Sequence, residues 1–186
     1  MKSPNAGSVL FADYWPDVPG VKLPVTVREM VFDDVSACAD LAAQRESGDT
    51  KVWRDAFVKS LSRDDRMTFV AVRDDEIVGY ASVTKLTLSS DPQSYGAPDG
   101  WYLAGTLVAP AWRRHGFGTA LTQACLDWLG RRCDKVWYFV NATNQASRDM
   151  HAKLGFRDVT SDFSIPKVTF AGGRGVLGVL DIAAQA

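Results

Sequence analysis

The chain has 186 residues, of which 46% are hydrophobic and 23% are charged, and its formal net charge is −1. This composition is ordinary for a globular protein with a proper core, so we expect one domain over residues 1–186, made of an extension (1–23) and a core (24–186). A net charge near zero, without a basic block, disfavours a nucleic-acid binder, which normally presents a basic face.

The three cysteines, Cys38, Cys125 and Cys133, lack the spacing of metal ligands, and two of them fall within apolar helical patterns. We interpret them as buried, reduced thiols, which suits the cytoplasm. We find neither a signal-peptide pattern nor an apolar run near the length of a membrane span. The expectation is therefore a cytoplasmic protein with no metal site and no membrane partner.

Residues 1–23 do not follow the pattern of the core. Phe11, Tyr14 and Trp15 lie there among acidic residues and prolines, which favours an extended arm packed on the surface. Two roles stay open for this arm, a partly ordered tail and a wall of a substrate site.

The first regular elements are predicted from residue 25 onward. Residues 25–30 alternate as a strand. Asp33 and Asp34 can cap a helix that follows, and Thr50 can cap a second helix.

A hairpin and the central strand come next. Residues 67–72 and 76–87 predict a hairpin that turns at Asp74-Asp75. Residues 88–100, rich in Ser, Asp, Pro and Gly, indicate a loop. The apolar run 101–109 then predicts a strand, which ends at a proline that cannot donate to a ladder.

The C-terminal part is predicted to hold three strands and one helix. Residues 136–140 show no polar alternation, which is typical of a strand buried on both faces. Asn144 can cap the helix, and Gly155 is a natural stop for it. Residues 156–163 and 176–182 predict two further strands.

The stretch after the central strand has features that point to a bound anion. It reads Arg113-x-x-Gly116-x-Gly118, and from Phe117 apolar residues recur at the spacing of one helix face. The first turn of a helix has unpaired N–H groups and the positive end of the dipole, and glycines let phosphate oxygens approach the main chain. Arg113 and Arg114 add guanidinium groups that match phosphate geometry. A helix start with two turn glycines and no ligand would show the same motif.

Together with its context, this motif resembles the GNAT superfamily of acyl-CoA N-acyltransferases. The family's Val-x-Pro-x-x-Arg-x-x-Gly-x-Gly pattern is matched by Val108, Pro110, Arg113, Gly116 and Gly118. A second block follows in order, in which Asn144 precedes a helix closed by Leu154-Gly155-Phe156. The resemblance covers roughly residues 25–163.

The resemblance implies an α/β (α+β) fold with a mixed, mostly antiparallel sheet of about six to seven strands and about four helices. In the family, the fourth and fifth strands splay apart and acetyl-CoA enters the gap. The implied cofactor-binding residues are Thr106, Leu107, Val108, Arg113, Arg114, His115, Gly116, Phe117, Gly118, Thr119, Asn144 and His151.

The resemblance further implies direct transfer of an acetyl group from the thioester to an amine. A backbone N–H near Val108 would donate to the tetrahedral oxyanion, and an acid would protonate the departing thiolate. The family's usual acid is a tyrosine, but His151 stands at that position. His151 is therefore a candidate acid, only a contact to the cofactor sulfur, or a residue on the surface of its helix. The strand glutamate that many relatives use is missing from residues 102–107, which leaves a water-mediated base or an acid from elsewhere.

In the family, the first helix pair borders the acceptor. The candidate acceptor contacts are Glu46, Asp49, Trp53, Asp99 and Tyr102, and the length of the loop 88–100 suggests a flap over the acceptor. Solvated charges and packed aromatics would give the same pattern. Acidic and aromatic residues in these positions favour a cationic small molecule, such as an aminoglycoside, a polyamine or an amino-acid-like compound.

Three functions stay open from the sequence. The first is an acetyltransferase that acts on such a small amine. The second is a protein acetyltransferase for an N-terminus or a lysine, which needs an open groove. The third is a non-catalytic acyl-CoA sensor, which the missing strand glutamate and the histidine keep open. Neither the acceptor nor the oligomeric state follows from the sequence, and a homodimer stays open.

Overall fold

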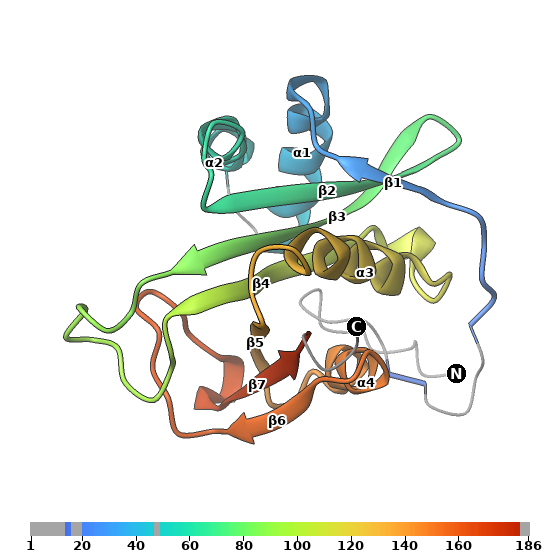
Figure 1. Cartoon of the computed structure of the whole chain (residues 1–186). Helices are drawn as coiled ribbons and strands as arrows, with labels where there is room; N and C mark the ends of the chain where they lie inside the picture. The colour runs from blue at the N-terminus through green and yellow to red at the C-terminus, as the bar shows by residue number, and fades with distance from the viewer. Residues whose placement is uncertain (1–13, 16–19, 47–48, 183–186) are drawn as a thin grey trace, which may run out of the picture.

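The computed structural model describes residues 14–15, 20–46 and 49–182, and Figure 1 shows their arrangement. Seven strands form one sheet in the order β1-β2-β3-β4-β5-β7-β6. Every neighbouring pair is antiparallel except β4 and β5, which are parallel. This mostly antiparallel sheet confirms the predicted fold class. The strands are β1 (Thr26–Glu29), β2 (Arg66–Arg73), β3 (Glu76–Leu86), β4 (Gly100–Val108), β5 (Lys135–Asn141), β6 (Arg157–Thr160) and β7 (Gly175–Asp181).

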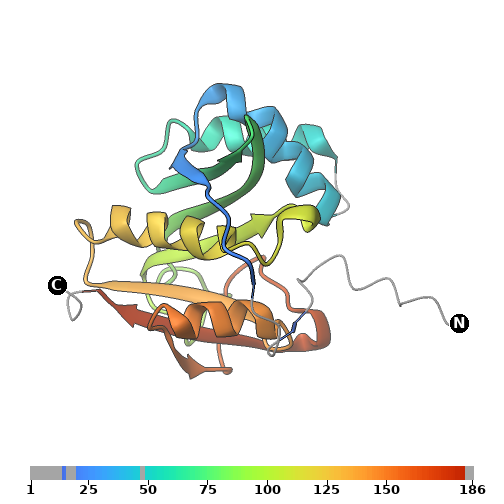
Figure 2. The same ribbon diagram turned by 90° about the vertical axis from the view of Figure 1, so that its right-hand side faces the viewer.

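Four α-helices cover the sheet in the part of the chain that the structure describes. They are α1 (Val35–Glu46), α2 (Thr50–Ser60), α3 (Phe117–Leu129) and α4 (Gln145–Lys153). Figures 1 and 2 show α3 and α4 on one face of the sheet and α1 and α2 on the other. None of these described helices has the length and apolar character needed to cross a membrane.

The alternation of β2 divides its side chains between two cores. Phe69 and Ala71 join the core that contains Phe117 and Leu121 of α3. Val70, between them, joins the core that contains Phe57 of α2. Because successive side chains of a strand point to opposite faces, every second residue of β2 faces α1 and α2.

The β2–β3 hairpin turns at the two residues that the sequence predicted. Asp74 and Asp75 have φ of 50° and 62°, the left-handed conformation that tight two-residue hairpin loops need at both central positions. Aspartate tolerates this conformation better than most residues do, so a turn without glycine forms here.

The start of α2 corrects one expected cap. The carboxylate of Asp49 accepts a hydrogen bond of 2.8 Å from the backbone N–H of Lys51, and Thr50 is already the first helical residue. The cap is therefore Asp49, because its extended backbone lets its carboxylate accept a hydrogen bond from the first turn of the helix that follows.

The loop 88–100 packs against the segment before β7. Tyr95 forms an isolated bridge with Ser164, and its hydroxyl donates to Asp162 at 2.6 Å. These contacts hold the middle of the loop against residues 162–164. The sequence had predicted a strand over residues 156–163, which reaches beyond the end of the observed β6.

Candidate active site

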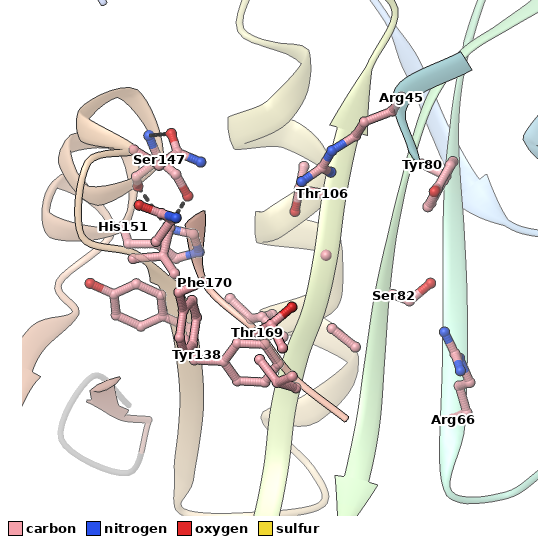
Figure 3. A pocket seen from close by; sticks show the side chains of 18 of the residues that line it. Arg45, Arg66, Tyr80, Ser82, Thr106, Tyr138, Ser147, His151, Thr169 and Phe170 are labelled. Carbon is pink, nitrogen blue, oxygen red and sulfur yellow. Dashed lines mark hydrogen bonds between the residues drawn. The ribbon is translucent and has the colours of Figure 1, made fainter. Parts of the chain in front are cut away.

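A pocket of about 650 Å³ lies where β4 and β5 separate. Figure 3 shows that His151 and Ser147 lie on one side of β4, while Tyr80, Ser82 and Arg66 lie on the other. The lining residues are Arg45, Trp53, Ala56, Phe57, Arg66, Tyr80, Ser82, Leu103, Ala104, Gly105, Thr106, Tyr138, Phe139, Val140, Asn141, Asn144, Ser147, His151, Val168, Thr169 and Phe170. The pocket thus joins the edge of α4 to the space beneath α1 and α2.

The gap between β4 and β5 follows from a bulge in β4. The parallel pairing of these strands runs from Trp101 opposite Val136 to Leu103 opposite Tyr138 in the described chain, and then stops. Directly after Leu103 the register of β4 with β3 shifts, and Gly105 takes φ of 112°. A bulge bends its strand, so β4 diverges from β5 where the pocket begins.

The main chain of β4 presents polar groups to this gap. Ala109 donates to the carbonyl of Val78 at 2.9 Å, which makes these two residues a hydrogen-bonded pair. Hydrogen-bonded and non-hydrogen-bonded pairs alternate along antiparallel strands. Val108 opposite Gly79 and Thr106 opposite Ala81 are therefore non-hydrogen-bonded pairs. Their peptide groups point away from β3 and into the gap.

The turn before α3 exposes a helix N-terminus. Gly116 is the residue before the helix and has φ of 84°, and Arg114 has φ of 67°. The first intrahelical bond runs from the N–H of Ala120 to the carbonyl of Gly116, so the N–H groups of residues 117–119 have no acceptor within the helix. A phosphate could be held there by main-chain donors.

The side chains of this turn have other partners. Arg113 donates through Nε to the carbonyl of Val108 at 3.3 Å, and Arg114 donates to the carbonyl of Trp15 at 3.0 Å. His115 Nδ1 lies 3.0 Å from the carbonyl of Val21. The described part of the arm therefore lies against the turn, whereas Phe11 falls outside the described residues.

His151 is buried and neutral. Its Nδ1 lies 2.7 Å from the carbonyl of Ser147, which requires a proton on Nδ1, and its ring stacks on Tyr138 at 4.3 Å between centroids. Burial lowers the pKa of His151 to about 4. Nε2 is buried and has no hydrogen-bond partner among the described residues. At neutral pH this nitrogen has a lone pair to accept with, so the environment opposes the expected role of acid.

Tyr138 is held by a short chain of polar contacts. Its hydroxyl donates to Asp158 at 2.6 Å, and Arg148 donates to the second oxygen of Asp158 at 2.7 Å. Burial and the hydrogen bond to Asp158 raise the pKa of the Tyr138 phenol. The ring that supports His151 is therefore fixed in place and protonated.

Asn144 occupies the position expected from the sequence. Its side-chain oxygen accepts from the N–H of Ser147 at 3.2 Å, which makes it the cap of α4, and it also lines the pocket. The two roles are compatible.

A match to a family model shows which protein family this chain belongs to. The model of the acetyltransferase (GNAT) family matches residues 29–156. This chain belongs to the GNAT family.

Individual relatives of this GNAT chain differ in their acceptors. A mycothiol acetyltransferase of Renibacterium salmoninarum is 30% identical over 173 residues, which cover 84% of this chain and 49% of the relative. The N-alpha-acetyltransferase RimI of Mycobacterium tuberculosis is 28% identical over 137 residues, which cover 73% of this chain and 80% of the relative. The chain spans only 35% and 49% of the length of two curated relatives that it matches.

Solved structures share the fold. An aminoglycoside 6'-acetyltransferase type Ii aligns with a TM-score of 0.63 at 19% identity, over 84% of this chain and 97% of that one.

The acceptor contacts expected in this GNAT chain are only partly brought together. Trp53 lines the pocket. Asp49 caps α2, and Asp99 accepts from the N–H groups of Leu88 and Ser89 and from the Ser89 hydroxyl. The Asp99 carboxylate therefore stabilises the loop 88–100 through these hydrogen bonds.

Tyr102 and Glu46 complete the expected set. Tyr102 is fully buried and donates to the carbonyl of Pro98 at 2.6 Å, so it packs in the core and does not line the pocket. The side chain of Glu46 lies outside the described residues.

The loop 88–100 supplies no residue to the pocket within the described chain. The loop therefore does not form the expected flap over this pocket, whereas residues 168–170, which precede β7, do line it. The sequence reasoning also missed Arg45 and Arg66. The signal for Arg66 was its spacing from Val70, because residues 66, 68 and 70 share one face of β2.

Proposed function

We propose that this chain is an N-acetyltransferase that transfers an acetyl group from acetyl-CoA to the primary amine of a small molecule. The observation that carries this proposal is that the open edge of β4 and the pocket adjoin each other. The open edge of β4 leads directly into a pocket of about 650 Å³. A thioester bound along β4 would therefore place its acyl carbon where an amine from the pocket can reach it.

The residues present fit acetyl-CoA. The peptide groups of Thr106 and Val108 would pair with the amides of the pantetheine arm like an added strand. The N–H groups of the first turn of α3 would hold the pyrophosphate, because Gly118 leaves the main chain uncovered. The cofactor supplies an activated acyl group on sulfur.

In the reaction, the neutral amine nitrogen attacks the acyl carbon, a C–N bond forms and the C–S bond breaks. The developing oxyanion would receive a hydrogen bond from a β4 backbone N–H near Val108. The amine loses a proton, and the departing thiolate gains one.

Proton transfer in this pocket would rely on water. The described residues that line it include no carboxylate, and buried His151 would not be protonated at neutral pH. We propose that a water relay takes the proton of the amine. Nε2 of His151 would accept a hydrogen bond from that water or from the cofactor.

A protein N-terminus is the second candidate acceptor. The similarity to the RimI of Mycobacterium tuberculosis favours it. The similarity to the mycothiol acetyltransferase favours a small molecule instead. Trp53, Phe57 and Phe170 in the lining would enclose a small acceptor.

The test is the release of free CoA thiol from acetyl-CoA in the presence of single amines at neutral pH. The panel contains amino acids, aminoglycosides, polyamines and short peptides. Turnover with small amines supports the proposal, and turnover with peptides alone favours the second candidate. Tight binding of acetyl-CoA without turnover for any amine contradicts both and favours the sensor.

A further inference from the structure

The pocket wall beneath α1 and α2 is positively charged. Arg45 comes from the last turn of α1 and Arg66 from the first residue of β2, and both line the pocket. In Figure 3, Arg45 extends toward Thr106 of β4, and Arg66 lies beyond Ser82. Among the described lining residues there is no aspartate and no glutamate. The acidic acceptor site expected from the sequence is therefore absent from this lining.

Arg66 is held on the pocket side by the register of the sheet. It pairs with Thr84 of β3, and the next pair on the same face is Thr68 with Ser82, whose hydroxyls are 2.8 Å apart. The following residue on this face is Val70, which is buried against α1 and α2. A strand side chain at position 66 therefore projects into the space between β2, β3 and α2.

The guanidinium of Arg66 is partly shielded from water, although the residue as a whole keeps intermediate exposure. Its Nε is buried and has no hydrogen-bond partner among the described residues. The nearby Asp65 is occupied by Arg63, which binds both of its oxygens at 2.7 and 2.6 Å. Burial lowers the pKa of Arg66. Burying a cation without a partner is unfavourable, and a bound anion would offset this cost.

We propose that the acceptor carries an anionic group, a carboxylate or a phosphate, and that Arg66 binds this group while the amine points toward β4. This inference rests on the proposed acetyltransferase function and names its substrate class. Arginine suits both anions, because its planar fork donates two parallel hydrogen bonds. Polyamines and aminoglycosides, which bring only positive charge, would be repelled by this wall.

The first experiment compares amines that differ only in the anion. Leucine is set against leucinamide, and O-phosphoethanolamine against ethanolamine, with spermidine and an aminoglycoside as polycations. Release of CoA thiol gives kcat and KM for each amine, measured over a range of pH to correct for the pKa of the amine itself. We expect the anionic member of at least one pair to have a kcat/KM roughly 10- to 100-fold higher than that of its neutral partner. The pair that responds distinguishes a carboxylate from a phosphate.

The second experiment assigns the effect to one residue. Arg66→Gln removes the charge, Arg66→Lys keeps it, and Lys59→Gln is the matched control, because Lys59 is exposed and lies outside the pocket. We expect Arg66→Gln to raise KM for the anionic acceptor roughly 10- to 100-fold. The KM for acetyl-CoA should stay the same, and the KM for the neutral partner should change much less than the KM for the anionic acceptor. Arg66→Lys should recover part of the loss, and Lys59→Gln should behave like the wild type.

Three results would overturn the inference. Equal or better turnover of neutral and cationic amines would reject the anionic acceptor while leaving the acetyltransferase function intact. An equal loss for all acceptors in Arg66→Gln would assign Arg66 a structural role. Binding of acetyl-CoA without acetylation of any amine would reject the proposed function itself, and the inference with it.

Discussion

The imidazole of His151 is buried, and the hydrogen bonds described for it join it to Ser147 and to no carboxylate. Its Nδ1 bonds the carbonyl of Ser147, its ring stacks on Tyr138, and burial lowers its pKa to about 4. An unperturbed histidine has a pKa near 6.5. The same residue that sequence position suggests as an acid is therefore kept neutral by its surroundings.

This shift predicts a specific pH dependence of stability. The pKa is lower in the folded state, so the unfolded chain binds more protons between pH 6.5 and 4, and stability falls as the pH falls through this window. The predicted loss of unfolding free energy from pH 8 to pH 5 is about 2 kcal/mol for this one group. Urea denaturation at both pH values measures it.

His151→Phe is the control for this prediction, because phenylalanine keeps a ring on Tyr138 and cannot be protonated. The wild type should lose more stability than this variant between pH 8 and 5. The same pH dependence in both proteins would mean that His151 titrates normally.

At the scale of elements, Asp49 illustrates how a capping residue can resemble a ligand. Its carboxylate is exposed and lies near α2, but it accepts the Lys51 N–H. We predict that Asp49→Ala lowers the unfolding free energy by roughly 1 kcal/mol, because one N-terminal donor of α2 loses its partner. Asp49→Ser, which can still cap, should lose much less.

Kinetics separate the cap from a substrate contact. If Asp49 acts only as a cap, KM for the acceptor stays the same in Asp49→Ala. A large rise in KM with unchanged stability would instead place Asp49 at the acceptor.

The N-terminus of α3 gives a second prediction at this scale. A methyl group at Gly118 would lie 3.3 Å from Met150 Sδ, the end of a flexible side chain, so Gly118→Ala should fold. We expect the affinity for acetyl-CoA to fall roughly 10-fold or more, because the methyl group keeps the pyrophosphate from the main chain. Calorimetry measures this.

Gly130→Ala is the matched control at the other end of α3. Gly130 has φ of −56°, and an added methyl group would meet its nearest atom at 3.5 Å. Its affinity for acetyl-CoA should equal that of the wild type. If the wild type, Gly118→Ala and Gly130→Ala bind acetyl-CoA with equal affinity, the pyrophosphate does not bind at this turn.

For the whole molecule, features that depend on neighbouring residues could be predicted from the sequence more fully than contacts between residues far apart in the chain. The β2–β3 hairpin, the helix that starts at Phe117 and the cap at Asn144 all depend on neighbouring residues, and the structure confirms them. The gap after Leu103 depends on a bulge whose location periodicity does not reveal.

The pocket wall was harder to predict, because its residues are far apart in the sequence. Arg66 lies on β2 and His151 on α4, 85 positions apart in the sequence. Only the order of the strands in the sheet brings these two residues to one pocket. The loop 88–100 has the composition of a flap, but its bridge to Ser164 holds it elsewhere. No local sequence pattern predicts against which part of the fold such a loop packs.

Acetyl transfer is proposed to take place in the gap between β4 and β5. The most direct measurement is a crystal structure of the protein with coenzyme A and an accepted amine. The predicted result places the pantetheine beside Thr106 and Val108, the pyrophosphate at the first turn of α3, and the amine in the pocket that Arg66 lines. Coenzyme A bound away from the gap between β4 and β5, or an amine bound outside this pocket, would contradict the account.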